Sequence, residues 1–93
     1  MVYLVSYDIS DNRRRTRLAK LLEKFAVRVQ YSVFEADLTP EQYHTMLRLA
    51  LKEIDDQEDN LRIYRLCFPC VQNIARYGRQ GWFEDYDQTG FVL

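Results

Sequence analysis

The sequence contains few of the residues that interrupt or cross-link a chain: 3 glycines, 2 prolines, 2 cysteines and 1 histidine among 93 residues. With so little Gly and Pro and no low-complexity run, a disordered or fibrous chain is excluded. Two cysteines do not make a disulfide scaffold, and a single histidine gives little support to Ser–His or Cys–His catalysis. No apolar run approaches the roughly 20 residues of a membrane helix, and the start has no signal-peptide pattern. We expect a cytoplasmic protein with no membrane partner.

The chain also lacks an excess of positive charge, since its net charge is −1. Strong nucleic-acid binders usually carry such an excess, but the distribution of the charges matters more than their sum. Glu23 is the only acid between residues 12 and 28, a stretch that holds seven of the thirteen basic residues: Arg13, Arg14, Arg15, Arg17, Lys20, Lys24 and Arg28. Acidic residues gather at 53–59 and 84–87. One end of the molecule is therefore expected to attract a polyanion.

The N-terminal segment predicts a strand followed by an amphipathic helix. Residues 2–8 are apolar on both faces, which is typical of a central strand, and Asp8 lies at its C-terminal end. Asp11 or Asn12 is suited to cap the next helix, whose apolar positions are Leu18, Leu21, Leu22 and Phe25. Arginines in the first turn of that helix oppose its dipole, so we expect an external anion, phosphate above all, to bind there.

The rest of the chain continues the alternation of strands and helices. Residues 27–38 form a β-type segment, longer than most strands, that a bend near 30–32 would split. Thr39, Pro40 and Gln42 are typical of a helix start with a capping box, and residues 61–66 predict a strand after an acidic turn. Residues 71–77 are ambiguous between strand and short helix. The tail at about 87–93 is strand-like and is expected to dock on a partner subunit, because an exposed apolar edge invites pairing.

This order of elements predicts the fold class α+β. We expect residues 1–93 to form one domain with a ferredoxin-like two-layer sandwich, in which both helices cover one face of a mainly antiparallel sheet. The other face of the sheet is then free for a sheet-to-sheet homodimer, which would help so small a domain to bury surface.

Two interpretations of Asp8 stay open at this point. A carboxylate at a strand end commonly forms a turn or caps a helix. It also suits Mg²⁺, which takes oxygen ligands and needs one or two protein carboxylates beside water and phosphate. A two-fold axis that brings two copies of Asp8 together would supply the second carboxylate.

The arginine cluster is either a solvated helix face or a phosphate-binding surface, and its position against the helix dipole favours the second. Thr16 and Ser32 are candidate neutral donors. Tyr7 and Phe34 offer rings for base stacking, although aromatics at alternating strand positions are more often core residues.

Three further features carry weaker hypotheses. Cys67 and Cys70 form a lone C-x-x-C, which is half of a zinc site, a redox pair in an unusual place, or simply two loop or buried thiols. Glu35 and Asp37 share a strand face and are conceivable as acid and base. His44 has no companion at metal-ligand spacing.

The sequence resembles the CRISPR-associated protein 2 family. The resemblance rests on Tyr7-Asp8-Ile9-Ser10-Asp11, on Arg15 and Arg17, on Gln30-Tyr31-Ser32-Val33-Phe34 and on the 61–67 segment, and it covers nearly the whole chain. It implies a ferredoxin-like homodimer in which the C-terminal strand of each chain joins its partner. It also implies a divalent-metal-dependent endonuclease, using Mg²⁺ or another cation such as Mn²⁺, that acts on RNA or double-stranded DNA.

The resemblance implies residue roles as well. Asp8 is the expected catalytic residue and metal ligand. The expected nucleic-acid-binding positions are Tyr7, Arg15, Arg17, Arg28, Ser32 and Phe34, with Arg13 and Arg14 enlarging the basic patch.

Two other functions stay open. The same family implies a non-catalytic dimeric scaffold that bridges the CRISPR integrase and captured DNA during spacer acquisition. A plain ferredoxin-like RNA-binding or regulatory module is the third possibility, and it requires aromatic side chains exposed on the sheet face.

Overall fold

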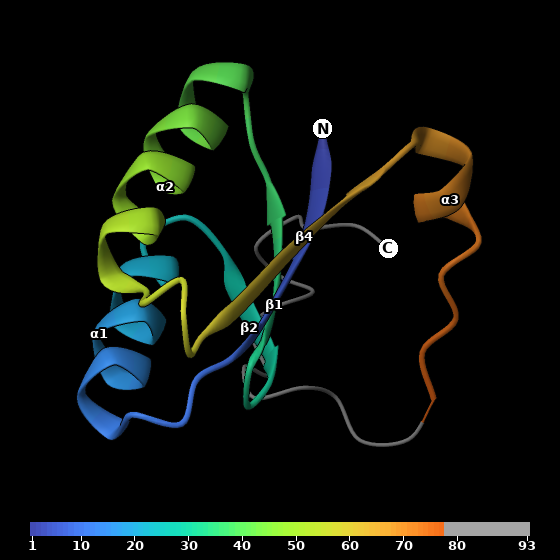
Figure 1. The fold of residues 1–93 in the computed structure, drawn as a ribbon. Helices are drawn as coiled ribbons and strands as arrows, with labels where there is room; N and C mark the ends of the chain where they lie inside the picture. Colours follow the sequence, from blue (N-terminus) through green and yellow to red (C-terminus); the bar gives the residue numbers. More distant parts are fainter. Residues whose placement is uncertain (78–93) are drawn as a thin grey trace.

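The computed structural model describes residues 1–77, and its seven elements follow the predicted alternation. They are β1 (Val2–Asp8), α1 (Asn12–Leu22), β2 (Val27–Gln30), β3 (Val33–Asp37), α2 (Pro40–Glu53), β4 (Asn60–Leu66) and α3 (Phe68–Gln72). The strands form an antiparallel sheet in the order β2-β3-β1-β4, with α1 and α2 together on one face (Figure 1). The predicted ferredoxin-like sandwich is confirmed. The predicted C-terminal strand at 87–93 lies outside the described residues.

β1 is a central strand, as its apolar composition predicts, because it pairs with β3 on one side and β4 on the other. Its alternation divides the strand between two environments. Tyr3, Val5 and Tyr7 are buried beneath the helices, whereas Leu4 and Ser6 face the other side of the sheet and are half-buried. The period of two along a strand places Asp8 on that second side.

Both long helices begin at the predicted caps. The side chain of Asp11 accepts a hydrogen bond from the backbone N–H of Arg14 at 3.0 Å, which satisfies one free donor of α1. In α2, the Thr39 hydroxyl accepts from the Gln42 N–H at 3.2 Å, and the Gln42 side chain accepts from the Thr39 N–H at 2.9 Å. The capping box predicted from the sequence is therefore present.

The long β segment at 27–38 is a hairpin, so the bend near 30–32 is real. β2 and β3 pair with a register shift between Arg28 and Gln30, and Tyr31 and Ser32 form the turn. Two hydrogen bonds hold this turn against β1: the Tyr7 backbone N–H donates to the Ser32 carbonyl at 3.1 Å, and the Tyr7 side-chain hydroxyl donates to the Tyr31 carbonyl at 3.3 Å. The hairpin forms without a glycine because β1 fixes it from outside.

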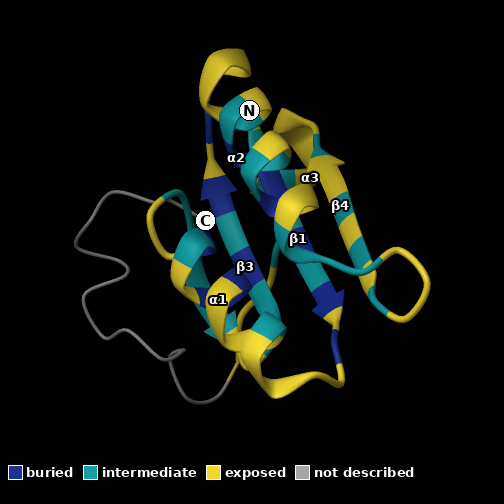
Figure 2. Ribbon diagram, turned by 60° about the vertical axis from the view of Figure 1, so that its left-hand side comes forward, coloured by how far each residue is buried: buried dark blue, intermediate teal, exposed yellow. Residues whose placement is uncertain are grey.

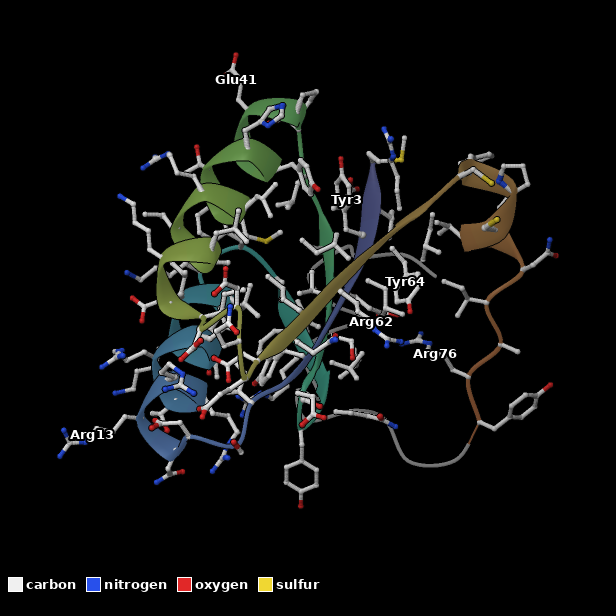
Figure 3. The ribbon with its side chains drawn as sticks, viewed as in Figure 1. Tyr3, Arg13, Glu41, Arg62, Tyr64 and Arg76 are labelled. Atoms are coloured by element: carbon white, nitrogen blue, oxygen red, sulfur yellow. The ribbon has the colours of Figure 1, made fainter. Side chains whose placement is uncertain are left out.

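The core lies between the sheet and the two helices (Figure 2). Its fully buried side chains include Val5, Phe34, Leu18, Leu22 and Met46. The opposite face, called here the open face, carries side chains that are half-buried or exposed within one protomer: Val2, Leu4, Ser6, Val33, Glu35, Arg62, Tyr64 and Leu66. Figure 3 shows Arg62 and Tyr64 pointing away from the helices.

The ambiguous segment after β4 contains a short helix rather than a strand. α3 spans Phe68–Gln72, and residues 73–77 have no regular structure. None of the helices in residues 1–77 has the length and apolar character that a bilayer crossing requires.

Candidate functional site

The Asp8 carboxylate is exposed at the end of β1, at the edge of a cavity. This cavity of about 570 Å³ is bounded by the end of β1, by α1 and by the β2–β3 turn. Cationic and hydroxyl side chains line it beside Asp8, namely Arg15, Thr16, Lys20, Arg28, Tyr31 and Ser32. A phosphate entering this cavity would find positive charge and the Ser32 hydroxyl next to two carboxylates, those of Asp8 and Glu23. The Thr16 hydroxyl already donates to the Asn12 carbonyl at 2.8 Å.

The donor type at Asp8 fits a hard divalent cation, but one protomer supplies too few ligands. Within residues 1–77 no group of three or more His, Cys, Asp or Glu side chains is placed to hold a metal ion. Across the β1–β4 pair, Asp8 lies opposite Asn60. The side-chain oxygen of Asn60 accepts a hydrogen bond from Arg62 Nε at 3.2 Å. A cation at Asp8 would therefore need substrate oxygens, water or a second copy of Asp8 to complete its shell.

Arg14 is not available to a phosphate, and its predicted binding role is corrected. Its guanidinium donates twice to Asp59, from Nε at 2.8 Å and from Nη2 at 3.1 Å, and also to Glu58 at 3.3 Å. The Asp59 side chain has no exposed surface. The hydrogen bond to Asp59 raises the pKa of Arg14, and the bond from Arg14 lowers the pKa of Asp59. The carboxylates that pair with Arg14 thus come from the acidic α2–β4 turn.

Two other members of the arginine cluster have internal partners. Arg15 Nη1 donates to the Ile9 carbonyl at 3.1 Å, and Nη2 donates to the Asn12 side chain. This arginine braces the loop that carries Asp8 into α1, while one side of it lines the cavity. Arg17 Nε donates to Glu53 at 2.8 Å across the α1–α2 boundary, although the arginine side chain is 58% exposed. Arg15 and Arg17, which were predicted to bind nucleic acid, therefore also form hydrogen bonds that hold the fold together.

The cations of α1 that are left for a ligand form a narrower group than predicted. Arg13, Lys20 and Lys24 are exposed, and none makes an ion pair with another residue of the range 1–77. Arg13 points outward from the start of α1 (Figure 3). Lys20 and Lys24 line a shallow groove between α1 and α2 together with Arg17 and Lys52. We call Arg13 and Lys20, together with Lys24 in the turn that follows Leu22, the free cations of α1.

Phe34 and Tyr7 belong to the core, so their predicted stacking on bases is corrected. Phe34 is 0% exposed and Tyr7 is 5% exposed, and their rings pack at 6.2 Å between centroids. The Arg28 guanidinium lies over the Phe34 ring at 5.1 Å, which places this arginine at the cavity through a cation–π contact. Ser32 is half-buried in the turn and lines the cavity.

Tyr31 was not among the predicted site residues. Strand alternation placed Tyr31 on the same face as Val29 and Val33. In the structure it lies in the β2–β3 turn beside the cavity, where the residue is 79% exposed. An aromatic residue followed by serine between two β-branched strand pieces was the available signal for an exposed turn. Lys20 was also missed, although its position one helical turn after Thr16 places it over the same cavity.

The remaining candidates lie away from Asp8. Asp37 accepts a hydrogen bond from the N-terminal ammonium at 3.2 Å, at the opposite end of β1. Cys67 and Cys70 are exposed and not buried, with their sulfurs 2.9 Å apart at the start of α3. They have no third ligand in the described part of the chain.

Comparison with known proteins agrees with this architecture. A family model described as CRISPR associated protein Cas2 matches residues 1–74. A protein of Chloroflexus aurantiacus named CRISPR-associated endoribonuclease Cas2 1 is 48% identical over 79 residues, which are 84% of this chain and 85% of that protein.

Solved structures agree with the sequence relatives. Cas2 of Streptococcus pyogenes superposes with a TM-score of 0.74 at 30% identity, covering 84% of this chain and all of that one. A chain in a structure described as a partial Cas6-RT-Cas1–Cas2 complex gives a TM-score of 0.70 at 30% identity, covering 81% and 82% of the two chains. Since the family model spans most of the sequence and the relatives are similar over most of their length, the chain belongs to the CRISPR-associated protein Cas2 family.

Proposed function

We propose that the chain is a CRISPR adaptation protein that acts in the cytoplasm as a homodimer and cuts phosphodiester bonds in RNA or DNA with a divalent cation, Mg²⁺ or Mn²⁺. The observation that carries the proposal is the Asp8 carboxylate, exposed at a strand end beside a cavity lined by Arg15, Lys20 and Arg28. The Chloroflexus relative is named an endoribonuclease, which supports the same reaction.

The open face gives the reason to expect two protomers. Leu4, Val33 and Tyr64 lie on the face opposite α1 and α2, and Asp8 lies on the same side of β1. If two sheets pack through these faces, the two copies of Asp8 come to a common interface. A pair of carboxylates would then serve one cation and one substrate phosphate.

The residues divide the chemical work. Asp8 would hold a divalent cation, which when bound supplies Lewis-acid stabilisation of charge on the phosphoryl oxygens and a more acidic water. The guanidinium of Arg28 and the ammonium of Lys20 would hold the non-bridging oxygens of the phosphate, while the hydroxyl of Ser32 donates to an oxygen. Arg15 keeps the Asp8 loop in place through its bonds to Ile9 and Asn12.

Asp8→Asn tests the proposal. The amide keeps the size of the side chain but removes the charge, so Mg²⁺-dependent cleavage of labelled RNA and double-stranded DNA should fall by about a hundredfold or more. Substrate binding in EDTA and the oligomeric state should stay unchanged. Asp56→Asn is the matched control, because Asp56 is an exposed carboxylate of the distant α2–β4 turn.

Residual cleavage that is equal in wild type and in Asp8→Asn would identify a contaminating nuclease and remove the enzyme assignment. If the wild-type protein still cleaves at its full rate in EDTA, the reaction does not depend on a divalent cation.

A second candidate function is a non-catalytic scaffold that bridges the CRISPR integrase and captured DNA. The similarity to a chain described within a Cas1–Cas2 complex favours it. A scaffold should keep full spacer integration in Asp8→Asn, whereas Arg13→Glu with Lys20→Glu and Lys24→Glu should reduce it. Reversing Arg14 would be a poor test, because that variant loses the bond to Asp59.

A further inference from the structure

Cys67 and Cys70 form a close thiol pair that the proposed nuclease or scaffold does not use. Their sulfurs are 2.9 Å apart and both residues are exposed. Cys67 is the N-cap of α3 and Cys70 is its third residue. Thr39 and Gln42 have the same spacing at the start of α2, where each side chain reaches the backbone N–H of the other residue. The backbone of the helix start therefore brings the two thiols together.

The pair lies far from the candidate site. Val2 pairs with Leu66, directly before Cys67, whereas Asp8 pairs with Asn60 at the other end of the same ladder. Six steps along β1 separate these ends by about 20 Å. A role in phosphoryl chemistry at Asp8 is thus ruled out by distance within one protomer.

The two thiols differ in acidity, which divides their roles. The side-chain hydrogen bond with Cys70 lowers the pKa of the Cys67 thiol, and the same contact raises the pKa of Cys70. Because the thiolate is the reactive form, Cys67 is suited to attack first and Cys70 to resolve.

We propose that Cys67 and Cys70 are a thiol–disulfide exchange site that closes to an intrachain disulfide when the protein meets a low-molecular-weight disulfide such as oxidised glutathione. The Cys67 thiolate attacks one sulfur of the small disulfide, forms a mixed disulfide and releases one small thiolate. Cys70 then loses its proton and attacks the Cys67 sulfur, which releases the second small thiol. The protein pair is oxidised by two electrons, and the small disulfide is reduced to two thiols.

The disulfide would close the start of α3. A five-residue helix has little stability of its own, since helix nucleation is unfavourable. A link from its N-cap to its third residue would hold the first turn in place. The oxidation state would thus set how firmly the chain is ordered where it leaves β4.

Intact-mass analysis of reduced protein treated with oxidised glutathione at neutral pH tests the site. Wild type should lose the mass of two hydrogens, become resistant to alkylation at both cysteines, stay a single chain and return to the dithiol with a reductant. Cys70→Ser should stop at the mixed disulfide. Cys67→Ser should likewise stop at a mixed disulfide, now on Cys70, because the second thiol is missing.

Folding provides the second readout. Closure should be several-fold slower in wild type unfolded by urea, where the helix start no longer holds the sulfurs together. A stable mixed disulfide in wild type, cross-linked chains, or closure that is as fast in urea would each overturn the proposal. Circular dichroism of the two variants checks that both are folded.

Discussion

At the residue scale, the pairing of Arg14 with Asp59 changes the meaning of the arginine cluster. A bidentate bond to a carboxylate with no exposed surface joins the start of α1 to the turn before β4. The backbone N–H of Asp55 also donates to Asp59 at 2.8 Å, so this one carboxylate ties an arginine and a turn together. Arg14 and Asp59 are therefore expected to contribute to folding more than to ligand binding.

Asp59→Asn should lower the melting temperature at neutral pH by several degrees, because it leaves Arg14 without its main partner. The pKa of Asp59 lies below its ordinary value of 3.8 in the folded state. The stabilisation is therefore complete above the unfolded pKa and is lost as the pH falls from about that value through the folded pKa. Thermal unfolding of wild type and variant from neutral to acid pH measures this, and the difference between them should shrink in acid.

Asp56→Asn serves as the control and should melt like wild type. An Asp59→Asn melting curve that coincides with that of wild type at neutral pH would show that the Arg14–Asp59 pair contributes nothing to stability.

Phe34→Leu should lower the free energy of unfolding by about 1–2 kcal/mol, because a fully buried ring is replaced by a smaller side chain. Nucleic-acid affinity should not change while the protein is folded.

Tyr31→Leu should leave the free energy of unfolding unchanged but reduce nucleic-acid affinity, if the exposed ring stacks on a base. Urea unfolding and fluorescence anisotropy measure the two quantities. A Phe34→Leu variant that is stable but binds weakly would restore the stacking role for Phe34.

Local chemistry was readable at single residues, but partners distant in sequence were not. Thr39 was predicted as a cap, and Asp11 was one of two candidates with Asn12, because a cap bonds within three residues. Asp59 was seen as one of several turn acids. Its bond to Arg14 spans 45 positions, and nothing local distinguishes it from Asp56.

At the element scale, α1 has two faces with different tasks. Leu18, Ala19 and Leu22 bury one face in the core, and the free cations of α1 stand on exposed positions. The spacing predicted both faces. It did not predict that Arg14 and Arg17 would be held by the turn and by α2.

Combined substitution of Arg13, Lys20 and Lys24 by glutamate should weaken binding of a short RNA or DNA duplex by roughly a hundredfold or more, because each contact with a phosphate is lost and replaced by repulsion. Fluorescence anisotropy at low salt measures the affinity. The control reverses Arg48 of α2 and Arg65 of β4, two exposed cations that do not line the groove of Lys20 and Lys24. If both variants lose affinity equally, net charge and not the position on α1 governs binding.

The hairpin was harder to predict than the helices. Glycine or Asn-Gly usually marks so tight a turn, and neither is present at Tyr31-Ser32. The turn depends on the Tyr7 backbone and hydroxyl in another strand. Its consequence, an exposed Tyr31, was therefore outside the reach of a strand pattern.

At the scale of the whole molecule, α1 and α2 lie on one face of the antiparallel sheet, and the short α3 lies on the other side of it (Figure 1). The fold class followed from the order of elements and from the family resemblance, and both the topology and the solved relatives confirm it. Whether the 87–93 tail joins a partner stays a prediction, since those residues lie outside the described part of the chain.

Leu4→Glu should disrupt the proposed homodimer, because it adds a carboxylate beside Glu35 on the open face, where burial would leave it unpaired. The dissociation constant should rise by at least about thirtyfold, corresponding to about 2 kcal/mol. Leu51→Glu adds the same charge to an exposed leucine of α2 and should leave the dimer intact. Sedimentation of the wild type and of the two variants measures the dissociation constant. A Leu4→Glu variant that sediments like wild type would show that the interface lies elsewhere.

The small number of free cations on α1 has a consequence for the thermodynamics of binding. Counterion release per phosphate contact sets the salt dependence of a protein–DNA complex, with a log–log slope of about −0.9 for each phosphate neutralised. Arg13, Lys20 and Lys24 alone would give a single protomer a slope of roughly −3, typical of a weak and easily displaced ligand. Two protomers on one duplex would double that value. The assembled pair, rather than the single chain, is therefore the unit expected to hold nucleic acid at physiological ionic strength.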